Sequence, residues 1–189
     1  MKKQAYRKYY YMLIMLISGI FSGTILTYFI QKSLFDKSIL SNFIVSELAT
    51  YDYFILLFTK NLLLLFIIIL VSTSLIGIII ISFILYMKGI MIGYWLMILI
   101  LNYHYQAIIL LIIFIPLLLI ELISILLIAN SGMTLSIKLI NLIIKKQKLC
   151  IKKWFSILLN RMIIAIILLS IHAFLYVLII IKISKWFQF

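Results

Sequence analysis

The residue with the clearest potential for chemistry is Glu121, an acidic side chain inside a long run of apolar residues. A carboxylate in such a setting is costly unless it faces other helices, pairs with a partner or carries a proton. Two interpretations stay open. Glu121 is either a polar contact, proton site or substrate site inside a helix bundle, or a residue within about one turn of a membrane interface. Pro116 shortly before it predicts a kinked or broken helix.

Other residues with catalytic or metal-binding side chains are few and scattered. His104 lies in a polar stretch, and His172 lies in an apolar run, where we expect a hydrogen bond between helices. Without Asp, Glu or Cys at ligand spacing, these two histidines do not predict a metal site. Cys150 is the only cysteine, so no internal disulfide is expected. Because the chain has four acidic residues and no catalytic motif, we expect neither enzyme activity nor a cofactor.

The composition indicates that these residues are positioned by helices in a lipid bilayer. Hydrophobic residues make up 67% of the 189 residues and charged residues 11%. Ordinary globular chains carry roughly 45–50% and about 25% of these classes. A span needs about 20 apolar residues, so the chain has room for about five crossings. We therefore predict an all-α, polytopic transmembrane helix bundle that forms a single domain over residues 1–189.

The apolar runs place the expected elements along the chain. A polar stretch over 31–54 follows the first run, and its apolar residues at helical spacing predict an amphipathic helix on the membrane surface. The short segment 89–103 is either a span or a re-entrant hairpin. The fourth run contains Pro116 and is predicted to be broken there. The expected spans are 10–30, 61–87, 89–103, 107–137 and 157–181.

The net charge of +13 predicts an orientation. The basic residues flank apolar runs, where they set topology and meet anionic lipids, so we do not expect nucleic-acid binding. Cytoplasmic loops of membrane proteins are enriched in Lys and Arg. This rule favours five spans, with the N-terminus and a basic loop over 138–156 in the cytoplasm and Lys88 in another inner loop. The basic loop and the start of the next helix hold Lys138, Lys145, Lys146, Lys148, Lys152, Lys153 and Arg161.

Two pairs of glycines have the spacing of helix-packing motifs. These are Gly19-x-x-x-Gly23 and Gly89-x-x-x-Gly93. Small residues four positions apart let helix backbones approach closely. Such pairs serve either ordinary packing within a chain or a dimer face, and we expect packing here.

Several of these motifs together resemble the stage II sporulation protein M family of small bacterial membrane proteins. The basic start followed by Ser18-Gly-Ile-Phe-Ser-Gly23 resembles that family's first helix. Tyr86-Met-Lys-Gly89-Ile-Met-Ile-Gly93 is similar to its motif after the second helix. Pro116-Leu-Leu-Leu-Ile-Glu121, followed by Ala129 and Gly132, matches its spacing of proline, glutamate and two small residues. The resemblance covers most of the first 135 residues.

The resemblance implies a non-catalytic role with two branches. Members of the family act in forespore engulfment, as membrane anchors for peptidoglycan-degrading partners. Relatives found with circular bacteriocin genes look like accessory components for maturation, export or immunity, which would handle a hydrophobic peptide. Frequent Ile and Lys are typical of AT-rich genomes such as those of Firmicutes, which suits both branches. In either branch the expected partners are membrane lipid and other membrane proteins, with homo-oligomerisation left open. The residues expected to serve packing or partner docking are Gly19, Gly23, Gly89, Gly93, Pro116, Glu121, Ala129 and Gly132.

Overall fold

The computed structural model describes residues 2–34, 50–145 and 151–186, and the regular elements in these ranges are α-helices. They are α1 (Lys2–Leu34), α3 (Thr50–Ser72), α4 (Gly77–Lys145) and α5 (Ile151–Trp186). Five stretches are long and apolar enough to cross a membrane, which confirms the predicted all-α transmembrane bundle. These stretches are Lys8–Ile30, Phe54–Ser72, Gly77–Leu101, Ala107–Ile144 and Trp154–Ile180.

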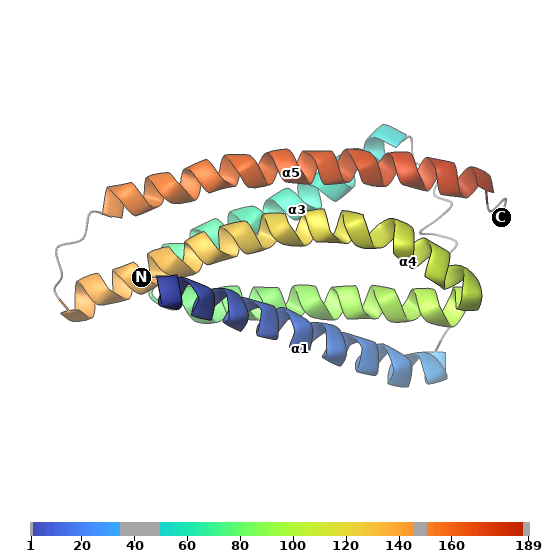
Figure 1. Ribbon diagram of the computed structural model, residues 1–189, viewed down its shortest axis with the longest axis horizontal. Coiled ribbons are helices and arrows are strands. Elements are labelled where there is room, and N and C mark those ends of the chain that lie inside the picture. The colour runs from blue at the N-terminus through green and yellow to red at the C-terminus, as the bar shows by residue number, and fades with distance from the viewer. Residues whose placement is uncertain (1, 35–49, 146–150, 187–189) are drawn as a thin grey trace.

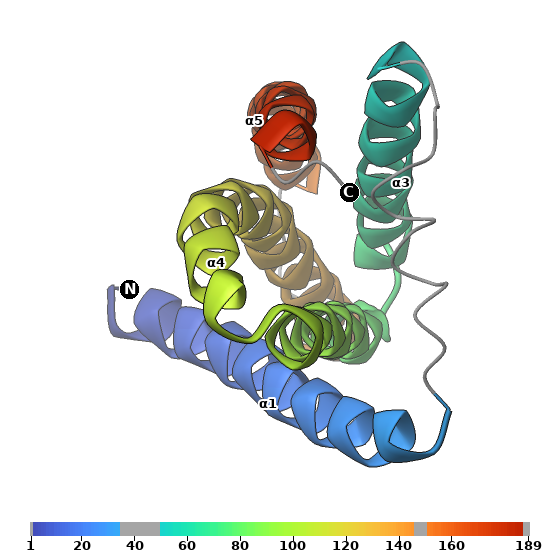
Figure 2. The ribbon, with the colours of Figure 1, turned by 90° about the vertical axis from the view of Figure 1, so that its right-hand side faces the viewer.

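Helix α4 supplies two of the five stretches because the chain reverses its direction within it. Its first arm, Gly77–Leu101, and its second arm, Ala107–Ile144, lie antiparallel, as the green and yellow-to-orange ribbons in Figure 1 show. The start of α1 and the end of α5 consequently lie at opposite ends of the bundle (Figure 1). Viewed from the end, α4 occupies the middle, with α1 and α5 on either side of it and α3 beside α5 (Figure 2).

The second and third spans begin and end at different residues from those predicted. The run 61–87, predicted as one span, is interrupted at residues 73–76, where α3 ends and α4 begins. The backbone N–H of Ser74 donates to the Val71 carbonyl at 3.0 Å, and that of Gly77 donates to the Ser74 carbonyl at 3.1 Å, which makes a tight turn. The third stretch therefore starts at Gly77 and is 25 residues long, rather than a short segment over 89–103.

A side chain from the second arm of α4 stabilises this turn. The Ser136 hydroxyl is fully buried and donates to the Ser74 carbonyl at 2.9 Å, with Leu75 O at 3.5 Å. The Ser74 carbonyl thus accepts two hydrogen bonds, one from the nearby Gly77 N–H and one from the distant Ser136 hydroxyl. The turn is therefore held by a residue distant in the sequence, and local sequence patterns do not reveal such a partner.

Helix α4 continues through Pro116, although a break was predicted at this residue. A proline removes one backbone hydrogen bond, and neighbouring helices in a membrane can accommodate that loss. The reversal of the chain lies between the two arms, near residues 102–106, instead of at the proline.

The predicted loops are also partly helical. Residues 31–34 belong to α1 and residues 50–54 to α3, and the rest of the predicted amphipathic segment lies outside the described residues. The predicted basic loop 138–156 is helical up to Lys145 and again from Ile151. Apolar residues of this segment, such as Leu139 and Trp154, pack against the core, which explains why the helices extend beyond their predicted ends.

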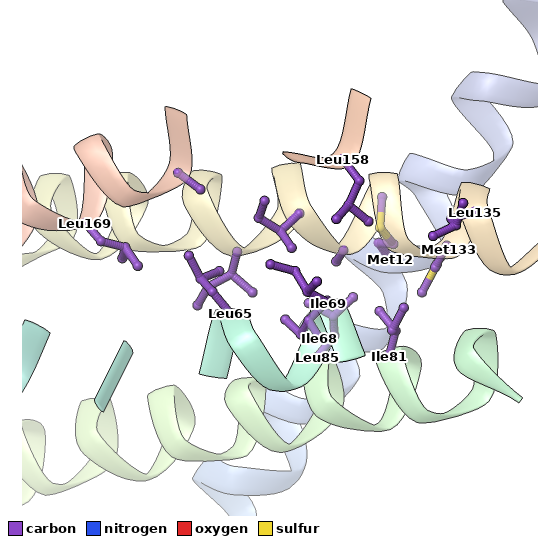
Figure 3. Close-up of a cluster of buried hydrophobic side chains, with 14 residues drawn as sticks. Met12, Leu65, Ile68, Ile69, Ile81, Leu85, Met133, Leu135, Leu158 and Leu169 are labelled. Carbon is purple, nitrogen blue, oxygen red and sulfur yellow. The ribbon is translucent and has the colours of Figure 1, made fainter. Parts of the chain in front are cut away.

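The main hydrophobic core brings together side chains from all four helices. Met12 of α1, Leu65 and Ile68 of α3, Leu85 of α4 and Leu158 of α5 are almost completely buried (Figure 3). A second cluster, around Phe114 and Leu99, packs the two arms of α4 together with α5. Most of the remaining large apolar side chains point outward, as expected where lipid is the solvent.

Candidate functional site

Glu121 is buried and forms an ion pair with Lys88. The Lys88 ammonium nitrogen lies 2.5 Å from a carboxylate oxygen of Glu121, and the two side chains are 10% and 11% exposed. Lys88 lies near the middle of the first arm of α4, and Glu121 lies in the second arm. The ion pair therefore connects the two arms well inside the spanning region. The prediction that Lys88 lies in an inner loop is wrong, because the first arm already begins at Gly77.

His172 of α5 belongs to the same buried region. Its ring is 3% exposed, and it interacts electrostatically with both Glu121 and Lys88. The Nδ1 atom of His172 is buried and has no hydrogen-bond partner among the described residues. We call Lys88, Glu121 and His172 the polar centre. It joins both arms of α4 to α5.

An aromatic cluster covers one side of the polar centre. The rings of His172 and Tyr176 lie 5.8 Å apart, and Tyr176 also contacts Phe114 at 5.4 Å. Phe114 in turn makes an edge-to-face contact with Trp95 at 5.4 Å. These rings continue from α5 to both arms of α4, and aromatic pairs in these geometries add to the stability gained by burial. The cluster therefore packs His172 against both arms of α4.

The ion pair of the polar centre is suited to hold the two arms of α4 together. A charge at mid-membrane depth is expensive, and pairing it with an opposite charge removes much of that cost. Breaking such a pair by removing one partner leaves an uncompensated buried charge. Within the described residues no three His, Cys, Asp or Glu side chains lie together as a metal site would require. Glu121 is thus a buried group held by a specific cation from the opposite arm.

The two glycine pairs pack directly against each other. A Cβ atom built on Gly19 would lie 3.0 Å from the Gly89 Cα and would overlap the Tyr86 carbonyl oxygen. A Cβ on Gly93 would overlap the Ile20 carbonyl oxygen, and one on Gly23 would lie 2.8 Å from the Ile90 Cα. The backbones of α1 and of the first arm of α4 therefore cross at a distance that only glycine allows. All four glycines therefore serve packing within the chain, where α1 crosses the first arm of α4.

The remaining packing candidates lie in the second arm of α4. Ala129 is fully buried in the main core. A Cβ on Gly132 would lie 2.9 Å from the Ser72 Cβ and 3.0 Å from the Ile81 Cδ1, so this glycine admits α3 and the first arm. Pro116 lies in the same arm, between the aromatic cluster and Glu121.

Of the basic residues expected to meet lipid, Arg161 has a described partner. Its guanidinium donates to the Ser131 hydroxyl at 2.9 Å. Lys145 ends α4, while Lys152 and Lys153 open α5, and their side chains lie outside the described residues. The same holds for Lys146 and Lys148, and for the side chain of His104.

Two residues with important contacts, Lys88 and Ser136, and the tight turn at 73–76 were not recognised in the sequence. Lys88 was interpreted as a loop residue because lysines often flank spans. Its place at the centre of the apolar run 77–101 is the signal that could have identified it. Ser136 and the tight turn were also missed, although Ser72, Thr73, Ser74 and Gly77 form a cluster of turn-forming residues in a long apolar run.

Comparisons with protein-family models, curated proteins and solved structures found no match to this chain. The resemblance to the stage II sporulation protein M family therefore stays a prediction, and what the coordinates establish is a multi-pass helical membrane protein with a buried ion pair.

Proposed function

We propose that this protein is a non-catalytic, multi-spanning scaffold subunit of a bacterial envelope complex in the cytoplasmic membrane, with its N-terminus in the cytoplasm. The observation that carries the proposal is the pairing of Glu121, the acid with the greatest potential for chemistry, with Lys88 at 2.5 Å. A carboxylate engaged in this way holds two helical arms together. This supports a structural role for the residue.

The glycine crossing supports the same conclusion. Both glycine pairs lie where α1 crosses the first arm of α4 and let the two backbones approach closely. These contacts and the ion pair act within one chain and produce a defined bundle. A defined bundle is what a scaffold requires if it is to present fixed outer surfaces to other membrane proteins. The proposed partners, suggested by the family resemblance, are enzymes that degrade peptidoglycan.

The outer surfaces offer positions where partners can be captured. Phe21 of α1 is 66% exposed, and Phe66 of α3 is 52% exposed, on helices that flank α4 from different sides. Phe114 is 8% exposed and provides a buried control. The test is to replace each of these residues in turn by a photo-crosslinking phenylalanine derivative in the native bacterium, and to identify the crosslinked proteins by mass spectrometry.

The crosslinked partners decide between the two branches. Cell-wall hydrolases or their membrane anchors, captured at position 21 or 66 and absent at 114, would support the scaffold proposal. An adjacent transporter or a bacteriocin precursor would support the alternative, an accessory component for maturation, export or immunity of a circular bacteriocin. Reproducible absence of protein partners from both exposed positions would count against the scaffold role.

A further inference from the structure

Three basic side chains gather around one face of the second arm of α4, near the end of the bundle that holds the N-terminus. Lys8 of α1 donates to the Thr134 hydroxyl at 3.3 Å. Arg161 of α5 donates to the Ser131 hydroxyl at 2.9 Å. We call Lys8, Lys138 and Arg161 the basic cluster. All three side chains are half-buried between helices.

Lys138 completes the cluster between the other two residues. It lies one turn beyond Thr134 along the second arm, and its ammonium group lies 5.1 Å from the centre of the Trp154 ring of α5. Lys138 and Lys8 are close enough to repel each other electrostatically. The fold therefore concentrates positive charge where α1, α4 and α5 meet.

No carboxylate among the described residues balances this charge. Of the described acids, Glu121 is paired with Lys88, and Asp52 lies near the start of α3, at the other end of the bundle. The hydroxyl groups of Thr134 and Ser131 accept hydrogen bonds from Lys8 and Arg161 and carry no charge to balance them. Thr134 donates its own proton to the Asn130 carbonyl, and Ser131 donates to the Leu127 carbonyl. The cluster thus presents donors and positive charge, which suit an anion.

The surroundings identify the type of anion. Basic pockets between transmembrane helices near an interface bind phospholipid head groups, and guanidinium groups match the geometry of phosphate. Trp154 and Tyr9 flank the cluster, and such aromatic residues are enriched at membrane interfaces. Deeper along the same helices, Ile123 and Ile164 are 53% and 49% exposed and offer an apolar path for acyl chains. This continuity favours a lipid over a soluble phosphate.

We propose that the basic cluster binds the phosphate group of an anionic phospholipid. Lys8, Lys138 and Arg161 supply the positive charge, and the head group neutralises their repulsion. The acyl chains lie along the outward apolar residues of α4 and α5. The bound lipid joins three helices and stabilises their packing. This site is independent of the proposed scaffold role.

The test uses the full-length protein in nanodiscs and measures its thermal unfolding. The variant Lys8→Gln/Lys138→Gln/Arg161→Gln removes the cluster. A matched control, Lys60→Gln/Lys182→Gln/Lys185→Gln, removes the same charge from the middle of α3 and from the last turns of α5. Each protein is compared in phosphatidylcholine alone and with added phosphatidylglycerol. Native mass spectrometry counts the retained lipids, and Thr134→Val tests a neighbouring hydroxyl while keeping all charges.

We expect phosphatidylglycerol to raise the unfolding temperature of the wild type and of the control. The cluster variant should lose this increase, and its apparent affinity for phosphatidylglycerol should fall by at least about tenfold, since all three charges that attract the anionic head group are removed. Thr134→Val should keep at least part of the response. If the triple variant does not fold in phosphatidylcholine, Lys138→Gln alone should show a smaller loss in the same direction.

Three results would overturn the proposal. An equal loss in the cluster variant and in the control would show that only overall charge matters. Full stabilisation of the wild type by inorganic phosphate, without anionic lipid, would identify a site for a soluble anion. Stabilisation by a polyglutamate peptide but not by phosphatidylglycerol would assign the cluster to an acidic protein segment.

Discussion

Lys88 and Glu121 lie at the centres of two antiparallel helical arms and meet at 2.5 Å, with both side chains almost completely removed from the surface. Removing one charge while the other stays buried should destabilise the fold by about 3–5 kcal/mol. We therefore expect Glu121→Gln and Lys88→Met to lower the unfolding temperature in detergent markedly. The double variant Lys88→Met/Glu121→Leu should recover most of the loss, because neither charge remains.

Lys60→Met provides the control for the ion pair. Lys60 lies on an exposed face of α3, so this change should have little effect. Unchanged stability of Glu121→Gln would show that the ion pair does not hold the arms together. Wild-type function of Glu121→Leu in the native host cell would remove Glu121 from any functional account.

The close crossing of α1 and α4 predicts that adding one methyl group at Gly89 strongly destabilises the fold. The new Cβ atom would lie 2.9 Å from the Gly19 Cα and would overlap the Leu16 carbonyl oxygen, so the backbones would have to separate. Gly89→Ala should cost about 1–3 kcal/mol or more, as overpacking usually does. Thermal unfolding measures the effect. Ser18→Ala, at an α1 residue whose hydroxyl bonds within its own helix, should be nearly neutral; equal losses in both variants would contradict the close crossing.

The tight turn at residues 73–76 predicts a water-accessible position in the middle of a long apolar run. In a Cys150→Ser background, Ser74→Cys and Lys148→Cys should react with a membrane-impermeant thiol reagent from the same side. His104→Cys should react from the opposite side, because the chain crosses between these positions. Labelling of positions 104 and 148 from one side would refute the five-span arrangement. If position 74 reacts from neither side, the result would favour the predicted single span over 61–87.

The Ser136 hydroxyl should contribute more than an ordinary serine in a transmembrane helix. It donates to the Ser74 carbonyl across a long sequence separation, and it is fully buried. Ser136→Ala leaves that carbonyl without this partner and should cost about 1–2 kcal/mol. Ser170→Ala is the control, since the Ser170 hydroxyl donates to the Ile167 carbonyl of its own helix. Indistinguishable unfolding temperatures for the two variants would show that the turn does not depend on Ser136.

His172 should be dispensable for stability because its buried Nδ1 atom has no hydrogen-bond partner among the described residues. Replacing a buried polar group that lacks a partner by an apolar group of similar size is often neutral or stabilising. We expect His172→Leu to unfold at the wild-type temperature or above it. A large loss of stability would mean that its interaction with the ion pair is essential. Normal stability combined with lost function would identify His172 as a functional residue.

The number and the type of the helices follow from the composition, whereas their boundaries depend on tertiary contacts. Apolar runs of span length identify membrane helices, and five such runs are present. The turn at 73–76 interrupts a run that remains apolar on both sides. Serine and threonine are tolerated inside membrane helices, so Ser72 and Ser74 did not by themselves mark an end. The hydrogen bond from Ser136 stabilises the turn, and it comes from another helix.

The functional site was predictable in its residue types but not in its pairings. A buried Glu121 requires a compensating group, and glycine pairs require a close backbone. Neither requirement identifies the partner. In the sequence Lys88 resembles an interfacial lysine, because the start of the first arm at Gly77 is not evident there. The sequence likewise does not indicate that the two glycine pairs pack against each other.

The glycine crossing also has a consequence for biogenesis. Gly19 leaves the ribosome long before Gly89, and synthesis adds about 5–20 residues per second, so roughly several seconds separate the two surfaces. During that interval α1 is inserted without its main partner, and its glycine face is open to lipid or to the insertion machinery. Completion of the bundle therefore waits for α4, and α1 reaches its final packing only after the first arm of α4 has been inserted.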